Sequence, residues 1–150
     1  MAWQPYVDAM LAGGFVQDAA ILGADDGLIW AQSANFKLST YDLEINVDID
    51  KTEKVNVNEQ ATVLEIFKTK GQVSSKAGIR IGGVKYVATA FDTDENASYL
   101  KSDNGGACAV RTNKCILIGT YDTKANPAQT SGNCNNNVAK LAKTLRDAQY

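Results

Sequence analysis

The chain has 150 residues, of which 45% are hydrophobic and 21% are charged, and its formal net charge is -2. This length and composition predict one globular domain over residues 1–150, and the small negative charge gives no general attraction to nucleic acid. Because the sequence contains no histidine and no glycine-rich phosphate loop, we expect neither an enzyme nor a bound cofactor or metal.

The sequence opens with MAWQPYVDAML, which lacks the basic start of a secretory signal. No apolar run approaches the roughly 18 residues of a membrane span. We therefore expect a cytoplasmic protein, in which Cys108, Cys115 and Cys134 are reduced. These three cysteines have no CxxC spacing and make a poor metal site.

The first predicted element is an amphipathic helix. Apolar and aromatic residues recur at helical spacing from Trp3 to Met10, and the run stops at Gly13 and Gly14. This pattern predicts about three helical turns. Pro5 is tolerated because the first turn has backbone donors without an intrahelical partner.

A β-hairpin is predicted next. The apolar segments 19–24 and 28–33 flank Asp25, Asp26 and Gly27, and the Asp-Gly pair suits the positive φ angles of a tight turn. Trp30 is therefore expected on the second strand.

Residues 41–50 alternate strictly between apolar and polar side chains, which predicts a half-buried strand with an acidic outer face. The period then changes to that of a helix. Asn56 and Glu59 have the spacing of a capping box, and Gly71 ends the run. The apolar stripe expected on this helix consists of Val57, Ala61, Leu64 and Phe67.

The remaining sequence predicts an antiparallel meander followed by a helix. Its expected strands are 78–81, 84–91, 99–101, 107–111 and 114–121. A polar loop containing Pro127 leads to the last helix, whose apolar stripe is Val138, Leu141, Ala142, Leu145 and Ala148. The predicted fold class is α+β, a central antiparallel sheet covered by the N- and C-terminal helices on one face and by a further helix on the other.

Large aromatic residues stand near both ends of the sequence: Trp3, Tyr6, Trp30 and, as the last residue, Tyr150. Chain ends usually fray, so such rings either tie the ends into the fold or are displayed to a partner. Core packing is the simpler interpretation from the residues alone, because Trp and Tyr are highly buried on average.

The order and spacing of these segments resemble the profilin family. The matching segments are Trp3-Gln4 with Tyr6-Val7-Asp8, Ala19 to Ala31, Gly82-Gly83-Val84-Lys85-Tyr86, Val110 to Tyr121, and the closing helix through Gln149-Tyr150. The acidic segment at about 37–55 has no counterpart in the family pattern.

The resemblance implies a monomeric cytoskeletal protein that binds monomeric actin, proline-rich segments of actin assembly factors and phosphoinositide lipids, and so regulates actin polymerisation. The implied polyproline-binding residues are Trp3, Tyr6, Trp30, Leu145 and Tyr150. The implied actin-binding residues are Lys85, Val87, Lys101, Arg111, Asn135, Asn136 and Lys140. The implied phosphoinositide-binding residues are Lys140, Lys143 and Arg146, for which a solvated helix face is the alternative.

This sequence departs from the family pattern at three places. Ala90 stands where relatives commonly have arginine, and Thr144 stands where many have an aromatic residue or histidine. Residues 130–133 are additional, and we expect them before the last helix. Ala90 and residues 130–133 fall in the implied actin surface, and Thr144 falls in the implied polyproline site.

The sequence allows two other interpretations. Acidic and polar residues from Asp48 to Glu59 match several positions of a calcium-binding loop, but Glu53 stands where that loop needs glycine, so an acidic strand or hairpin is favoured. A sensor or trafficking module of PAS-like or longin-like architecture is the alternative function, because small helix-covered sheets host many functions.

Overall fold

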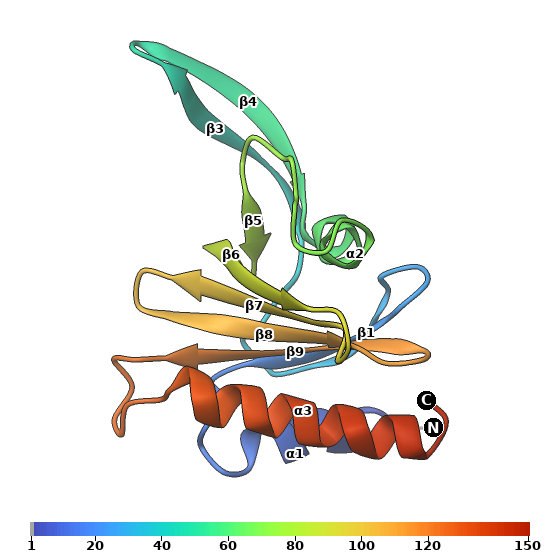
Figure 1. Ribbon diagram of the computed structural model, residues 1–150. Coiled ribbons are helices and arrows are strands. Elements are labelled where there is room, and N and C mark those ends of the chain that lie inside the picture. Colours follow the sequence, from blue (N-terminus) through green and yellow to red (C-terminus); the bar gives the residue numbers. More distant parts are fainter. Residues whose placement is uncertain (1) are drawn as a thin grey trace.

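The computed structural model describes residues 2–150 and contains one curled antiparallel sheet with three helices (Figure 1). The elements are α1 (Gln4–Leu11), β1 (Ala19–Gly23), β2 (Ile29–Gln32), β3 (Thr40–Asp48), β4 (Lys51–Asn58), α2 (Glu59–Lys68), β5 (Ile79–Ile81), β6 (Val84–Asp92), β7 (Ala97–Ser102), β8 (Gly105–Arg111), β9 (Cys115–Asp122) and α3 (Ser131–Asp147). Seven strands pair in the order β2-β1-β9-β8-β7-β6-β5, while β3 and β4 form a separate two-stranded ribbon.

Helices α1 and α3 cover one face of the sheet, and α2 lies on the other (Figure 1). The two faces carry separate hydrophobic clusters. On β9, for example, Leu117 belongs to the cluster under α1 and α3, and Ile118 belongs to the cluster under α2. The central strands are therefore buried on both faces, which explains why their sequences are continuously apolar. This arrangement confirms the predicted α+β architecture.

Helix α1 is shorter than expected, because it ends at Leu11. Pro5 lies in its first turn, where the missing N–H costs little. Val7 and Met10 are buried against the sheet. Within residues 2–150, no helix combines the length and apolarity needed to cross a bilayer.

The predicted start and buried face of α2 are wrong. Strand β4 continues to Asn58, which pairs with Thr40, so Val57 belongs to the strand and not to a helical stripe. Asn58 is the N-cap, and its side chain accepts a hydrogen bond from the backbone N–H of Ala61 at 3.1 Å. Ala61 itself is exposed, and the buried stripe is displaced along the helix. Its members are Glu59, Thr62, Val63 and Ile66, with Leu64 and Phe67 partly buried.

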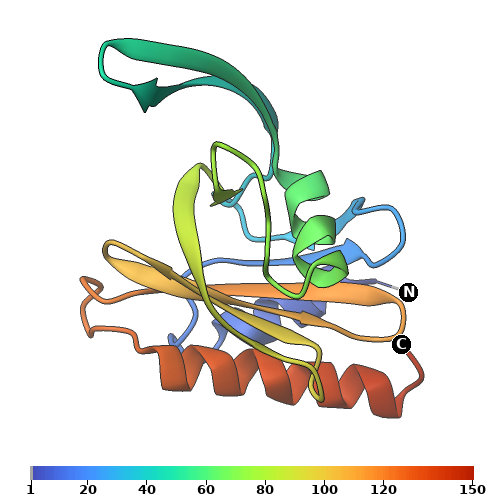
Figure 2. The same cartoon turned by 45° about the horizontal axis from the view of Figure 1, so that its top comes forward.

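The alternating segment 41–50 does form a strand, but this strand pairs only with β4 and stands apart from the main sheet. The hairpin β3–β4 projects from the body in both views (Figures 1 and 2). Most of its polar side chains are exposed, Leu43, Ile45 and Val55 are partly exposed, and only Val57, at the base of the hairpin, is buried among its apolar residues. The residues that matched a calcium-loop count thus run from the tip of this ribbon along β4 to Glu59, the first residue of α2.

Helix α3 begins earlier than expected. Thr130 is its N-cap, and the Thr130 hydroxyl accepts a hydrogen bond from the N–H of Asn133 at 3.3 Å. Three of the four additional residues therefore form the first helical turn instead of a preceding loop. The helix buries Cys134, Val138, Ala142 and Leu145 against β8 and β9, whereas Ala148, expected in the stripe, is an exposed C-cap.

Candidate functional site

An aromatic cluster lies where the two chain ends meet. The Trp3 ring is 4.8 Å from Trp30, 5.6 Å from Tyr6 and 5.5 Å from Tyr150, measured between ring centroids. The Trp3 and Tyr150 rings meet edge to face, and the other two pairs are tilted. Such spacings are those of favourable aromatic pairs. The structure thus brings four of the five predicted polyproline-site residues into one cluster.

Three elements position the rings. Helix α1 carries Trp3 and Tyr6 to the edge of β2, where the Gln4 side-chain amide donates to the main-chain oxygen of Gln32 at 3.3 Å. Trp30 lies on β2 close to Gly23, and a Cβ atom at that glycine would lie 3.1 Å from the indole nitrogen. A side chain at position 23 would therefore press against the Trp30 ring.

Tyr150 is held by contacts that the sequence does not predict. Its main-chain oxygen accepts hydrogen bonds from the N–H of Lys114 and from the Thr112 hydroxyl, the latter at 3.0 Å. The Lys114 ammonium also lies 5.4 Å from the centre of the Tyr150 ring, within cation–π range. No local pattern signals these contacts, because more than thirty residues separate the partners in sequence.

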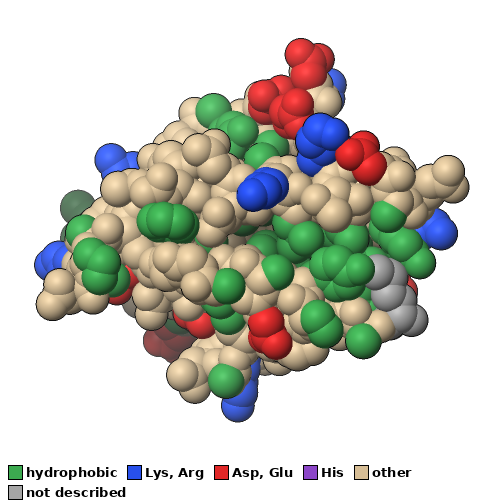
Figure 3. All heavy atoms as spheres, turned by 90° about the horizontal axis from the view of Figure 1, so that it is seen from below, with side chains coloured by type: hydrophobic (Ala, Val, Ile, Leu, Met, Phe, Trp, Pro, Cys, Tyr) green, Lys and Arg blue, Asp and Glu red, His purple; other side chains and the backbone are tan. Residues whose placement is uncertain are grey.

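The rings are both packed and displayed. Trp3, Tyr6 and Tyr150 pack on the cluster under α1 and α3 but are only partly buried, and Trp30 is 37% exposed. Leu145, the fifth predicted residue, is 1% exposed and belongs to the core beneath the rings, so it supports the site without forming an open wall. Figure 3 shows hydrophobic side chains gathered at this end of the α1–α3 face.

Thr144 adds no further ring to the cluster. Its side chain is exposed on α3, and its hydroxyl donates to the main-chain oxygen of Lys140 at 3.1 Å. The aromatic site is consequently built from Trp3, Tyr6, Trp30 and Tyr150.

A second surface lies at the far end of strands β6 and β7. Val87 pairs with Lys101 across these strands, and Val87 is 64% exposed. Lys85, two residues earlier on β6, lines the same shallow hollow as Val87 and Lys101. A neighbouring groove connects Lys101 with Asn135 of α3. Four predicted actin-binding residues, Lys85, Val87, Lys101 and Asn135, therefore form one continuous surface, here called the β6–β7 surface.

The structure separates Arg111 from this set. Arg111 pairs with Ile116, whose side chain belongs to the cluster under α2, so Arg111 points to the opposite face of the sheet from the residues that pack under α3. Its guanidinium lies 3.9 Å from the carboxylate of Asp25. Asn136 and Lys140 lie on the outer side of α3 and line a different hollow, together with Glu95.

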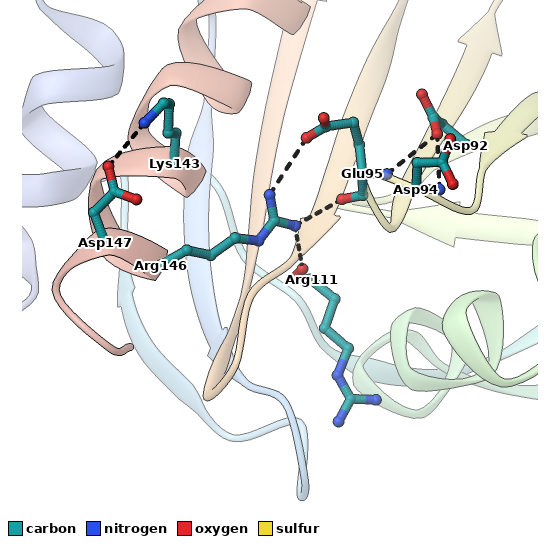
Figure 4. A network of polar contacts seen from close by, with 7 residues as sticks. All are labelled: Asp92, Asp94, Glu95, Arg111, Lys143, Arg146 and Asp147. Carbon is teal, nitrogen blue, oxygen red and sulfur yellow. Dashed lines mark hydrogen bonds and ion pairs between the residues drawn. The ribbon is translucent and has the colours of Figure 1, made fainter.

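Two of the three basic residues of α3, Lys143 and Arg146, are paired within the protein (Figure 4). Arg146 donates to the main-chain oxygens of Glu95 and Arg111 at 2.6 and 2.7 Å. Lys143 forms an ion pair with Asp147 at 2.9 Å, and this hydrogen bond raises the pKa of the Lys143 ammonium. Lys140 shares its hollow with the same two acidic residues. This arrangement favours the solvated helix face over a strongly basic patch.

Comparisons with known proteins agree with the architecture. A family model described as Profilin matches residues 1–150. The profilin of Tetrahymena pyriformis is 39% identical over 153 residues, which cover 99% of this chain and 98% of the relative. The crystal structure of Acanthamoeba castellanii profilin II has a TM-score of 0.73 at 32% identity and covers 99% of both chains.

Two more distant structures share the fold and contain a partner. Mouse profilin IIa is in complex with a double repeat from the FH1 domain of mDia1; it has a TM-score of 0.66 at 17% identity and covers 100% of both chains. LokiProfilin2 is in complex with rabbit actin; its TM-score is 0.65 at 20% identity, with 94% of this chain and 92% of that chain covered. At these identities the likeness concerns the fold.

Proposed function

The chain belongs to the profilin family, and we propose that it binds proline-rich segments at its aromatic cluster and monomeric actin at its β6–β7 surface. By binding both, it regulates actin polymerisation in the cytoplasm, as a binding protein without catalysis of its own. The observation that carries this proposal is the contact of Trp3 with three partly exposed rings. The alternative of a PAS-like or longin-like module is not favoured.

The cluster suits a polyproline II helix. Such a segment is already extended and has no internal hydrogen bonds, so little conformational entropy is lost when flat rings cover its prolines. The indole N–H and phenol O–H groups can donate to the ligand's free carbonyl oxygens. Because the rings are tied to α1, β2 and the Lys114 backbone, they are already placed for binding, which lowers the cost of association.

The β6–β7 surface suits a protein partner. Val87 supplies an exposed apolar centre, and Lys85 and Lys101 flank it with positive charge. An exposed hydrophobic residue rimmed by charges is typical of an interaction surface. The lysines favour an acidic counterpart, which would steer association and fix the orientation of the partner.

The proline-binding proposal is tested by titrating the protein with a proline-rich peptide while tryptophan fluorescence is recorded. We expect a saturable change in the wild type and no binding by Trp3→Ala, measured by calorimetry because that variant has lost one fluorophore. Phe15→Ala is the matched control, since Phe15 is a 44% exposed ring outside the cluster. Equal affinity of wild type and Trp3→Ala would refute the site.

The actin proposal is tested by the polymerisation of pyrene-labelled actin. Excess wild-type protein is expected to slow assembly, and the double variant Lys85→Glu, Lys101→Glu to lose this effect. Lys68→Glu, at the end of α2, is the control because it reverses an exposed charge away from the β6–β7 surface. No slowing by the wild type would refute binding to monomers.

A further inference from the structure

A hollow of about 390 Å³ opens on the face of the sheet that α2 covers. Its apolar lining, Phe36, Ile81 and Tyr86, belongs to the cluster under α2. Segments far apart in the sequence meet here: those before β1 and β3, the β5–β6 and β7–β8 turns, and the end of β9. The aromatic cluster lies at the other end of β1, beside Gly23. The volume is at the small end of the range for small-molecule sites, about 300–1,000 Å³.

The Tyr86 hydroxyl lines this hollow without a partner. The Tyr86 side chain is 6% exposed and packs in the same cluster as Phe36. Even so, no group of residues 2–150 hydrogen-bonds to its phenol oxygen. Burial, and to a smaller extent the charge of the Asp18 carboxylate, raise the pKa of this phenol to about 12, so it stays neutral at physiological pH. Buried polar groups are nearly always hydrogen-bonded, and this one is therefore available to a ligand in the hollow.

Three carboxylates line the hollow, those of Asp18, Asp103 and Asp122. Within the described chain, no lysine or arginine forms an ion pair with any of them. Asp18 is partly buried and held in place. One of its carboxylate oxygens accepts from the Ser33 hydroxyl at 2.9 Å, and its N–H donates to the Thr120 hydroxyl at 3.1 Å. The hollow thus offers fixed negative charge that has no counter-charge in the fold.

Lys85 is the one basic residue along the hollow in residues 2–150, and its side chain leads away from it. Side chains alternate along β6, so Lys85 points to the opposite face of the sheet from the buried Tyr86, toward Val87 and Lys101. Its Cε atom would lie 3.4 Å from a Cβ atom at Gly78, which does not line the hollow. The hollow is therefore negatively charged, although the protein as a whole is nearly neutral.

We propose that this hollow binds a primary ammonium group, carried either by a small alkyl diamine or by a lysine side chain of a partner protein. An ammonium has three donors, and the Asp18 carboxylate and the Tyr86 hydroxyl accept from two of them. The aromatic rings that line the hollow add cation–π attraction. Asp103, exposed at the rim, suits the second charge of a diamine. Binding here goes beyond the proposed function and does not depend on it.

The test is calorimetric titration of the full-length protein with diaminobutane, and with butanediol as a neutral molecule of the same length. We expect saturable binding of the diamine, weaker at high salt, and none of the diol. In Asp18→Asn the charge is lost while an acceptor for Ser33 remains, and we expect affinity to fall about tenfold. Tyr86→Phe removes only the unpartnered hydroxyl, so affinity should fall several-fold while the midpoint of urea denaturation stays unchanged.

Tyr41→Phe is the matched control for the phenol, because the Tyr41 hydroxyl donates to Glu59 at 2.7 Å. It should lower the urea midpoint and leave diamine binding unchanged. Asp94→Asn, which neutralises an exposed carboxylate outside the hollow, should change neither.

A parallel titration with N-acetyl-lysine methylamide distinguishes the two sources of the ammonium. Tighter binding of this amide supports a partner's lysine, and tighter binding of diaminobutane supports a free diamine. The inference is wrong if the wild type binds neither compound, or if butanediol binds as well as the diamine. Equal affinity of the wild type, Asp18→Asn and Tyr86→Phe for the diamine would also overturn it, since the charge then acts from elsewhere on the surface.

Discussion

Replacing Glu59 is expected to destabilise the protein strongly. This carboxylate has no exposed surface and accepts from three backbone N–H groups and one phenol, which come from the segment before β3, from β3 itself and from the β5–β6 turn. In Glu59→Ala these donors lose their acceptor. Each buried donor left unsatisfied costs about 1–3 kcal/mol.

Because water can enter and satisfy some of the donors, we expect a total loss of about 3–5 kcal/mol in the free energy of unfolding. That is a large part of the roughly 5–15 kcal/mol typical of a domain. Urea denaturation followed by circular dichroism measures this loss as a lower midpoint at a similar m-value. Glu65→Ala is the control, since Glu65 is a partly buried glutamate of the same helix. A loss below about 1 kcal/mol in Glu59→Ala would refute the assigned role.

Three further predictions concern the core and α3. Burial raises the pKa of the Cys108 thiol to about 12 from its ordinary 9.0, so the folded protein keeps a proton that the unfolded chain releases. The free energy of unfolding should then fall as pH rises above about 9, and less steeply in Cys108→Ala; equal slopes would contradict this. Arg146→Ala should cost about 1–2 kcal/mol in urea denaturation, because two main-chain oxygens lose a charged donor, and Arg146→Lys should cost less. Lys140→Glu with Lys143→Glu should leave cosedimentation with phosphoinositide vesicles unchanged, and a several-fold loss would show that α3 binds lipid.

The elements that the sequence predicted well are those with strong local signals. The Asp-Gly turn placed β1 and β2 correctly, and Gly82-Gly83 placed the β5–β6 turn, where both glycines have positive φ. The start of α2 was missed because Asn56 and Asn58 are both capable caps, and pairing with β3 keeps the chain extended up to Asn58 in β4, a strand that the sequence did not predict. The pairing of β4 with β3 thus determined which of the two asparagines caps the helix, a choice that the local sequence leaves open.

The candidate sites were predicted only in part, since a side chain's direction depends on register. Arg111 lies on β8, and alternate side chains of this strand pack under α3. Because successive side chains of a strand point to opposite faces of the sheet, Arg111 points to the face that α2 covers. Leu145 belongs to the predicted apolar stripe of α3 and is accordingly buried below the rings. The role of Glu59 has no local signal beyond capping, because its donors come from segments about twenty residues away on either side.

The length of α3 relates the two proposed binding surfaces. Asn135, near its start, belongs to the β6–β7 surface, and Leu145, near its end, lies beneath the aromatic cluster. A helix of 17 residues is about 25 Å long at 1.5 Å per residue, so the two surfaces lie at opposite ends of a rigid element. The partners therefore contact separate parts of the molecule, and proline-rich peptide should bind with unchanged affinity when actin is already bound. Competition between the two ligands in calorimetry would show that the surfaces overlap or are coupled.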